Sequence, residues 1–381
     1  MSRSVLHTFI AILISVTSIQ ATATALTQTL AGPSVNARNY VVVDTKSGQT
    51  LIEQSADQPV PPASLTKLMT AYLTFVALRE GQLKLDQQAT VSIEAWKAGG
   101  STMFLQPRLP VTADQLIQGL VVVSGNDAAI VLAQTIGGTT ASFVQLMNIT
   151  AKQLGMHQSH FDSVNGIPTP THLISAGDIA LLTIHIMREF PQHLHYFGEQ
   201  TFTYNNVTQR NWNPLVFTDS TVTGMKTGHT DEAGYCLDAT ARRNGRDLIA
   251  VVLGSATRGD SANAAEALLD FGFRFSETKL AYHAGQQISS LSNAWASPNL
   301  VSLGITDDLW VSMPVEHYGS LKAKVDIPAR ITLPIAKGQV FGSLILSVNE
   351  REISRTPLVV MSTVQKASWL NHMWNMINAF L

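Results

Sequence analysis

The feature that most constrains this 381-residue sequence is a serine three residues before a lysine, at the start of an apolar helix. Two prolines favour an extended entry, and the residues after them are expected to form a helix ending at Gly81. Ser64 would lie in the first helical turn, where free backbone N–H groups and the helix dipole favour negative charge. Lys67 follows one turn later on the same face, among apolar and small neighbours. Its burial predicts a lowered pKa and a neutral amine able to accept the serine proton.

Two further motifs decide between this chemistry and a plain helix start. Taken alone, the pair also fits a helix cap next to a lysine that reaches solvent. Downstream, however, come Ser124-Gly125-Asn126 and then Lys226-Thr227-Gly228-His229-Thr230. The ordered set Ser-x-x-Lys, Ser-x-Asn and Lys-Thr-Gly is typical of β-lactamases and penicillin-binding proteins. The sequence therefore predicts an enzyme with a serine nucleophile.

The N-terminus and the composition indicate an exported protein. Residues 1–25 contain an early arginine, an apolar run and two Ala-x-Ala sequences, which is typical of a signal peptide cleaved after Ala23 or Ala25. The formal net charge of −2 and the 14% of charged residues give no basic surface for nucleic acid. The one cysteine, Cys236, excludes an internal disulfide, and we expect it to be a small buried residue.

Strand and helix patterns divide the mature chain into two folded parts, 26–281 and 282–363. In the first, residues 40–53 predict a β-hairpin and residues 261–271 a closing helix. An antiparallel meander is expected from three segments, 221–226, 234–242 and 247–254. The second part consists of short strand-like stretches separated by Gly, Pro and Asp turns, which predicts a small all-β domain.

The last segment, 364–381, has the pattern of an amphipathic helix too polar to span a bilayer. Its polar face carries Asn371, His372, Asn375 and Asn378. Its apolar face carries Trp369, Leu370, Met373, Trp374, Met376, Ile377, Phe380 and Leu381. Two tryptophans on an exported chain favour binding to a membrane surface. The alternative is a terminal helix docked on its own β domain.

Together with Gly272-Phe273-Arg274-Phe275-Ser276-Glu277-Thr278, the three motifs give a chain that resembles the low-molecular-mass penicillin-binding proteins acting as D-alanyl-D-alanine carboxypeptidases. The resemblance covers essentially the whole mature chain. It implies an α/β (α+β) fold of the penicillin-recognising transpeptidase and β-lactamase type. An antiparallel sheet flanked by helices would meet an inserted helical lobe, with the active site between them. The small all-β domain and the terminal helix would follow.

The resemblance also assigns a role to each motif residue. Ser64 would be the nucleophile, Lys67 its general base, and Ser124 a hydroxyl bonded to both lysines that passes a proton to the leaving D-alanine. The backbone N–H groups of Ser64 and His229 would form the oxyanion hole. The remaining residues would bind substrate: Asn126 the peptide backbone, Lys226 and Thr227 the terminal carboxylate, and Gly228 by leaving the strand edge free.

The implied substrate is the D-Ala-D-Ala end of peptidoglycan pentapeptide stems, and β-lactams are the implied covalent inhibitors. No cofactor is expected. The pairs His157/His160 and His193/His195 lack the spacing of a metal site and are interpreted as solvated loop residues. The expected place is the periplasmic face of the bacterial inner membrane. Two alternatives remain: an idle wall-binding scaffold, and a class A-like β-lactamase, whose deacylating glutamate has no counterpart in residues 155–180.

Overall fold

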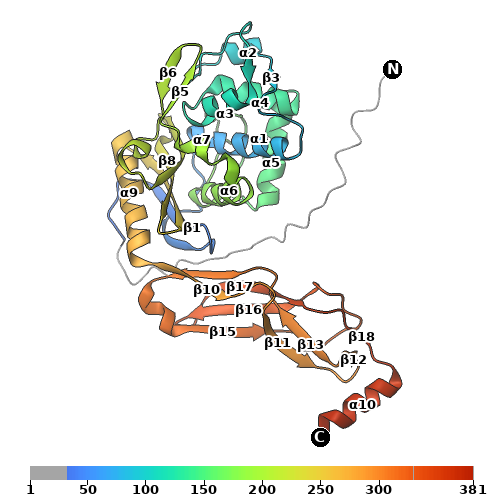
Figure 1. Ribbon diagram of the computed structural model, residues 1–381. Coiled ribbons are helices and arrows are strands. Elements are labelled where there is room, and N and C mark those ends of the chain that lie inside the picture. The colour runs from blue at the N-terminus through green and yellow to red at the C-terminus, as the bar shows by residue number, and fades with distance from the viewer. Residues whose placement is uncertain (1–31, 329, 381) are drawn as a thin grey trace, which may run out of the picture.

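An antiparallel sheet of five strands, in the order β2-β1-β9-β8-β7, forms the centre of the first domain in this computed structural model (Figure 1). The structure describes residues 32–328 and 330–380, so the expected signal peptide lies outside the described residues. The strands are β1 (Asn39–Asp44), β2 (Thr50–Gln54), β7 (Val222–Thr230), β8 (Gly234–Arg243) and β9 (Arg246–Ser255). The expected hairpin and meander are both present, and Asn244 and Gly245 take positive φ in the turn between β8 and β9.

Helices cover both faces of this sheet, which explains its continuously apolar strands. In β9, Ile249, Val251 and Leu253 join the core on the side of the helical lobe, whereas alternate residues join the core under α9. The helices are η1 (Ala63–Thr66), α1 (Lys67–Arg79), α2 (Ile93–Trp96), α3 (Ala113–Val121), α4 (Asn126–Gly137), α5 (Thr140–Leu154), α6 (Ala176–Glu189), η2 (Pro191–His193), α7 (His195–Gly198), α8 (Leu215–Thr218) and α9 (Arg258–Phe275). Two small strand pairs complete the lobe: β3 (Gln88–Ala89) with β4 (Val111–Thr112), and β5 (Thr201–Tyr204) with β6 (Val207–Arg210).

Two boundaries in the first domain differ from the sequence prediction. The closing helix α9 is longer than the expected 261–271, because the Thr257 side chain caps its N-terminus by accepting from the Asp260 N–H. At the other end of the domain, Ser64 lies in the 3₁₀ turn η1, and α1 begins only at Lys67. Ala63 takes a φ of +48° at this junction, so the chain enters α1 through a tighter turn than an α-helical start.

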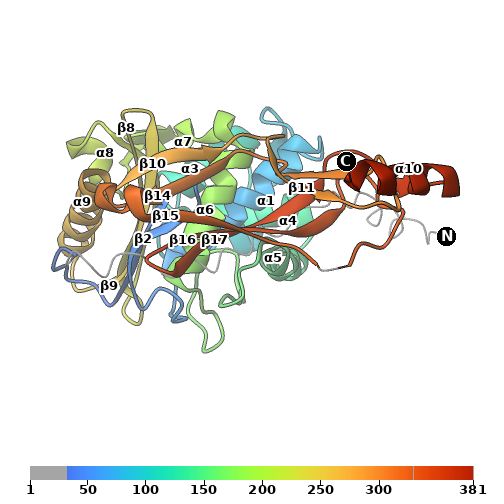
Figure 2. The same cartoon turned by 90° about the horizontal axis from the view of Figure 1, so that it is seen from below.

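The second domain is all-β, as expected, with a five-stranded sheet in the order β11-β13-β17-β16-β15. Figure 2 shows this domain lying across the end of the first, with α10 projecting from its far end. Its strand β10 runs across the predicted boundary between residues 281 and 282, which stays a prediction. The elements are β10 (Glu277–Tyr282), β11 (Gln287–Ser292), β12 (Ala296–Ser297), β13 (Leu300–Gly304), β14 (Leu309–Met313), η3 (Val315–Ser320), β15 (Leu321–Asp326), β16 (Val340–Val348), β17 (Arg351–Val360), β18 (Gln365–Lys366) and α10 (Trp369–Phe380).

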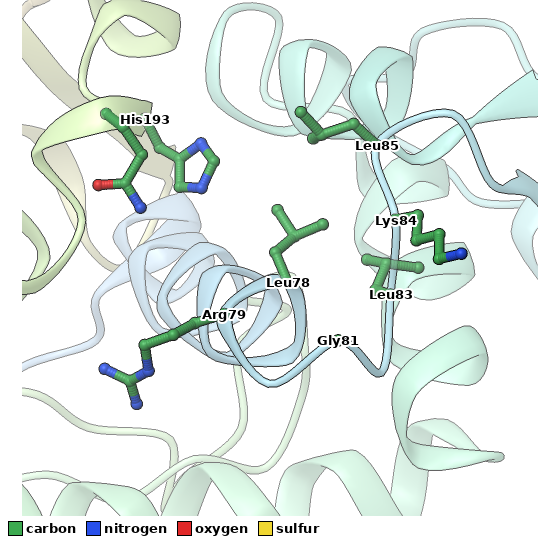
Figure 3. Close-up of a pocket in the computed structure, with 8 residues that line it drawn as sticks. Leu78, Arg79, Gly81, Leu83, Lys84, Leu85 and His193 are labelled. Atoms are coloured by element: carbon green, nitrogen blue, oxygen red, sulfur yellow. The ribbon is translucent and has the colours of Figure 1, made fainter.

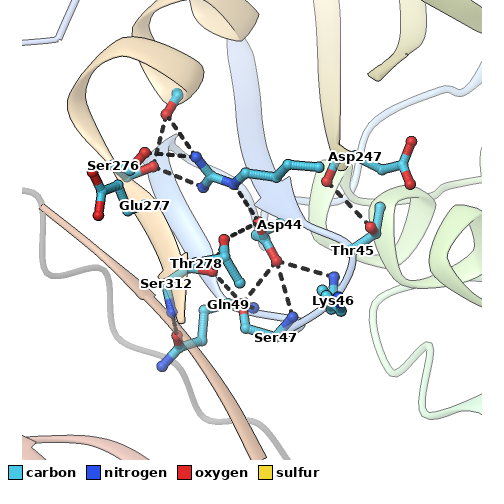
Figure 4. A network of polar contacts seen from close by, with 12 residues as sticks. Asp44, Thr45, Lys46, Ser47, Gln49, Asp247, Ser276, Glu277, Thr278 and Ser312 are labelled. Carbon is cyan, nitrogen blue, oxygen red and sulfur yellow. Dashed lines mark hydrogen bonds and ion pairs between the residues drawn. The ribbon is translucent and has the colours of Figure 1, made fainter. Parts of the chain in front are cut away.

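A buried polar network joins the two domains at the turn after β1 (Figure 4). The Asp44 carboxylate is paired with Arg246 at 2.7 Å and accepts from the Thr278 hydroxyl at 2.6 Å. Ser312, on β14, lies 2.8 Å from the Ser47 hydroxyl, and its N–H donates to Gln49 at 2.6 Å. These contacts connect the β1–β2 hairpin of the first domain directly to β10 and β14.

In the described part of the chain, no single helix has the length and apolar composition to cross a membrane. One pair, α4 with α5, passes that test together, with an 83° bend between its members.

Candidate active site

Ser64 and Lys67 are in direct contact at the junction of η1 and α1. The Lys67 amine lies 2.8 Å from Ser64 Oγ and donates to the Asn165 carbonyl at 2.9 Å. Its side chain is fully buried, at 0% exposure. This burial, reinforced by the nearby positive charge of Lys226, holds the pKa of Lys67 well below its usual range. The site therefore presents a serine hydroxyl beside an amine whose neutral form is favoured.

A second buried lysine faces the site from the sheet. Lys226 donates to Ser124 Oγ and to the Thr227 carbonyl, both at 2.9 Å. Burial lowers its pKa to about 7. Ser124 lies between α3 and α4 with a φ of +59°, a conformation that directs its hydroxyl toward the sheet.

One expected contact of Ser124 is not made. Among the described residues its hydroxyl is hydrogen-bonded to Lys226 and not to Lys67, so the expectation that it bonds both lysines is wrong for this state. The physical reason is that the Lys67 amine is directed to Ser64 and to the Asn165 carbonyl instead.

The third motif lies on β7, an edge strand of the sheet. A Cβ added to Gly228 would come within 3.0 Å of both the Pro62 carbonyl oxygen and the Ser64 nitrogen, so only glycine lets the strand approach the serine this closely. Thr227 is half-buried beside it. His229 is exposed, and its ring stacks on Tyr235 with a centroid distance of 4.0 Å. An edge strand offers unpaired backbone groups to which an extended peptide can bind.

Asn126 closes the site from the helical lobe. Its side-chain amide donates to the Gly99 carbonyl and its backbone N–H to the Ser101 carbonyl, each at 2.7 Å. The 99–101 loop thus orients the Asn126 side chain, and the side-chain oxygen Oδ1 can accept a hydrogen bond from a ligand. The structure brings all eight predicted residues, Ser64, Lys67, Ser124, Asn126, Lys226, Thr227, Gly228 and His229, to the junction of η1, the start of α4 and β7.

Comparisons with known proteins agree with this geometry. A family profile described as D-alanyl-D-alanine carboxypeptidase matches residues 25–257, and one described as penicillin-binding protein 5, C-terminal domain, matches residues 276–366. The chain belongs to the D-alanyl-D-alanine carboxypeptidase family. It is 36% identical over 364 residues to D-alanyl-D-alanine carboxypeptidase DacC of Escherichia coli, covering 93% of this chain and 91% of the relative.

Solved structures place the fold in the same family. Penicillin-binding protein 5 of Haemophilus influenzae matches with a TM-score of 0.83 and 35% identity, over 88% of this chain and all of that chain. Penicillin-binding protein D2 of Listeria monocytogenes, solved in an ampicillin-bound form, matches with a TM-score of 0.60 and 29% identity, over 64% of this chain and 100% of that one. The predicted fold and the predicted enzyme class, a D-alanyl-D-alanine carboxypeptidase, are confirmed.

Asp127 is a residue of the carboxypeptidase site that the sequence reasoning missed. It is 2% exposed, and its carboxylate accepts from the backbone N–H groups of Met103 and Leu105 at 3.0 to 3.1 Å. These bonds pin the loop beside Asn126 and leave Phe104 exposed with a φ of +65°. Burial raises the pKa of Asp127. The sequence feature that indicates Asp127 is its position directly after the Ser124-Gly125-Asn126 motif.

Asn165 and His172 are two further residues beside Ser64 and Lys67 that the three motifs do not indicate. Asn165 supplies the carbonyl that holds Lys67, and His172 is 1% exposed behind η1. Both belong to the loop between α5 and α6. Neither was predictable, because each contacts a segment about 100 positions away in sequence.

Of the predictions for Cys236 and His193, the first is confirmed and the second is wrong. Cys236 is buried as expected, and burial raises its pKa to about 11, which leaves an unreactive thiol. His193, interpreted as solvated, is in fact half-buried and stacks on Phe75 at a centroid distance of 4.7 Å. It contributes to packing because the chain turns back over α1 after Phe190.

A separate pocket of about 460 Å³ lies at the other end of α1, lined by Leu78, Leu83, Leu85 and His193 among others (Figure 3). Since α1 has 13 residues, its two ends are separated by roughly 20 Å. The pocket is therefore not part of the serine site.

Proposed function

We propose that this carboxypeptidase removes the terminal D-alanine from peptides ending in D-Ala-D-Ala through an ester formed on Ser64. The observation that carries the proposal is the 2.8 Å contact between Ser64 Oγ and the fully buried Lys67 amine. A serine hydroxyl is a weak nucleophile until an adjacent base takes its proton. A lysine with a strongly lowered pKa supplies that base at neutral pH.

In the acylation step, Ser64 Oγ attacks the carbonyl carbon of the penultimate D-alanine while Lys67 takes the hydroxyl proton. The N–H groups of Ser64 and His229 stabilise the oxyanion of the tetrahedral intermediate. When the C–N bond breaks, the leaving amine takes up a proton. The proton that Lys67 took from Ser64 is passed to this amine through the Ser124 hydroxyl, which is hydrogen-bonded to Lys226, so Lys67 is neutral again for the next step. D-alanine then leaves and the acyl group remains on Ser64.

Substrate binding uses the charge of Lys226 and the free edge of β7. Lys226 in its charged form attracts the terminal carboxylate, and the Thr227 hydroxyl donates to it. Asn126 accepts from the peptide backbone on the opposite side of the cleft. The expected substrate is therefore a peptidoglycan stem that ends in a free D-alanine carboxylate, and β-lactams would acylate the same serine.

Hydrolysis of the ester completes the cycle. Residues 155–180 contain no glutamate to activate water, so Lys67 is the base available for this step. A departed D-alanine leaves room for water at the ester, whereas the ring remnant of a penicillin stays attached and blocks it. The peptide ester should therefore turn over quickly and the penicilloyl ester slowly, which favours the carboxypeptidase over the β-lactamase alternative.

A labelling experiment tests the proposal. Wild-type protein and Ser64→Ala are incubated with a fluorescent penicillin, and released D-alanine is measured with a D-Ala-D-Ala peptide. We expect both signals from wild type and neither from Ser64→Ala. Labelling of the Ser64→Ala protein would overturn the assignment of the nucleophile, and labelling without D-alanine release would favour the idle scaffold.

We further propose that the protein is exported and bound to the periplasmic face of the inner membrane through α10. The support is the way this helix docks: its polar face, not its apolar face, lies on the β domain. His372 is stacked on Trp295 at 3.4 Å, and the Asn375 amide donates to the carbonyls of Ala294 and Ala296. Trp369, Leu370 and Trp374 are 65 to 70% exposed. Amphipathic helices bind an interface through such an apolar face.

Vesicle sedimentation tests this second proposal. The full chain should sediment with phosphatidylethanolamine–phosphatidylglycerol vesicles, and Trp369→Ser/Trp374→Ser should not. Trp96→Ser, at a tryptophan that is 51% exposed on the first domain, is the matched control. A full chain that stays in the supernatant, or a double variant that still sediments, would contradict the proposal. A variant that lacks α10 should end at Ser368 and not at Thr363, the predicted end of the β domain. Val364 is buried and β18 pairs with β12, so both belong to the β domain.

A further inference from the structure

A buried hydrogen-bond chain runs from the 162–172 loop to the backbone just before Ser64. The Asp162 N–H donates to His172 Nδ1 at 3.0 Å, and His172 Nε2 lies 2.8 Å from the Thr66 hydroxyl. That hydroxyl donates to the Ala63 carbonyl at 2.8 Å. Thr66 and His172 are 0% and 1% exposed. None of these side chains carries out a step of the proposed reaction.

The donor and acceptor roles along these hydrogen bonds follow from the groups that form them. A backbone N–H can only donate, so His172 Nδ1 is the acceptor and the ring proton is on Nε2. Nε2–H then donates to Thr66, whose own proton is left for Ala63. Burial lowers the pKa of His172 to about 4, which keeps this neutral tautomer at neutral pH. The His172 ring and the Thr66 hydroxyl are thus each used once as donor and once as acceptor.

This chain of hydrogen bonds ends on the peptide group that contains the proposed oxyanion donor, the Ser64 N–H. The Ala63 carbonyl and the Ser64 N–H belong to one planar trans peptide, so they point in opposite directions. A hydrogen bond that fixes the carbonyl on one side therefore fixes the N–H on the other. Ala63 has a φ of +48°, a conformation that L-residues keep only where neighbouring contacts enforce it.

Two glycines pack against this peptide group from opposite sides. A Cβ on Gly166 would come within 1.9 Å of the Ala63 carbonyl oxygen, on the side of the His172 chain. A Cβ on Gly228 would come within 3.0 Å of the Ser64 nitrogen, on the side of β7. The carbonyl thus faces the 162–172 loop while the N–H faces the edge strand where the substrate lies.

We propose that His172 and Thr66 are positioning residues that orient the Ser64 N–H toward the oxyanion. The inference rests on the proposed function, since it takes Ser64 N–H as an oxyanion donor. Removing such a donor outright costs about 10²- to 10³-fold in rate. Loosening a donor that is still present should cost less, about tenfold in the rate constant of acylation. The affinity of the complex before acylation should not change.

Paired substitutions test the role against a merely structural one. Thr66→Val keeps the shape and removes the hydroxyl, and Thr66→Ser keeps the hydroxyl. His172→Asn offers an acceptor to the Asp162 N–H but no donor to Thr66, and His172→Gln offers the donor in the place of Nε2. Stopped-flow acylation by a fluorescent penicillin gives the acylation rate constant and the dissociation constant of the first complex separately.

We expect Thr66→Val and His172→Asn each to lower the acylation rate constant about tenfold with an unchanged dissociation constant. Thr66→Ser and His172→Gln should recover most of it. The double variant Thr66→Val/His172→Asn should be no slower than either single variant, because both break one chain. Wild-type rates in both single variants, equal losses in all four, or losses that multiply in the double variant would overturn the inference. Ser64→Ala in parallel separates the two proposals: if it is still labelled, the proposed function itself has failed.

Discussion

Replacing Asp44 with Asn should destabilise the protein markedly without changing its chemistry. The Asp44 side chain has 0% exposure and is paired with Arg246, itself only 15% exposed, at 2.7 Å. Breaking a buried ion pair on one side costs about 3–5 kcal/mol, because the remaining charge loses its partner. Asn keeps one acceptor oxygen for Thr278 or Ser47, so we expect the lower end, about 3 kcal/mol. The corresponding fall in Tm is roughly 4–6 °C, from an unfolding entropy of about 2.1 cal/mol/K per residue.

The assay is thermal and urea unfolding followed by tryptophan fluorescence, with Asp326→Asn as the matched control. Asp326 forms an exposed pair with Arg355 at 3.5 Å, and such pairs contribute about 0–1 kcal/mol. Penicillin acylation at 25 °C should be unchanged in both variants, since the Asp44 network lies at the domain junction. A fall in Tm no larger than that of Asp326→Asn would refute the argument that this buried pair holds the junction.

The remaining predictions concern the pH dependence of stability and of substrate binding, and the general base. Burial raises the pKa of Asp44, but hydrogen bonds from Thr278 and Ser47 and the charge of Arg246 outweigh it, so its folded pKa is lowered. Its contribution is present above the unfolded pKa of about 4 and is lost as pH falls through the folded value, so the wild-type and Asp44→Asn unfolding free energies should converge in acid. The Lys226 pKa of about 7 predicts that KM for a D-Ala-D-Ala peptide rises above pH 7, and a C-terminal methyl ester of the same peptide should show no such rise. Lys67→Ala should lower acylation by about as much as Ser64→Ala, since nucleophile and base act as a unit, and an unimpaired Lys67→Ala protein would remove the lysine from the mechanism.

The sequence predicted the parts of the site that depend on local pattern. Ser64 and Lys67 lie one turn apart, and such a spacing brings the side chains together in a 3₁₀ turn as well as in an α-helix. The Lys-Thr-Gly motif lies on a strand, as its β-rich surroundings indicated, and the structure shows that this strand is at the sheet edge. The predicted helix at 364–381 is present from Trp369, but it begins five residues later than predicted because Gln365 and Lys366 pair with β12 as strand β18. The structure adds that the polar face of α10 contacts the β domain.

What escaped prediction depends on contacts between distant segments. The Lys67–Asn165 and Thr66–His172 hydrogen bonds span 98 and 106 positions, and no periodicity in one segment encodes its partner in another. The absence of the Ser124–Lys67 contact was unpredictable for the same reason. The Lys67 amine is hydrogen-bonded instead to the Asn165 carbonyl, which is supplied by a distant segment. The 3₁₀ turn at Ser64 follows from the positive φ of Ala63, which the 162–172 loop stabilises from outside the motif.

The most direct test of the central claim follows one preparation of the protein with two ligands. Intact mass spectrometry records the lifetime of the penicilloyl adduct and locates it by peptide mapping, and an enzymatic assay records D-alanine released from a D-Ala-D-Ala peptide. The geometry of Ser64 and Lys67 predicts an adduct on Ser64 that persists while the same enzyme releases D-alanine over many turnovers. Rapid loss of the penicilloyl adduct without any release of D-alanine, or an adduct on another residue, would contradict it.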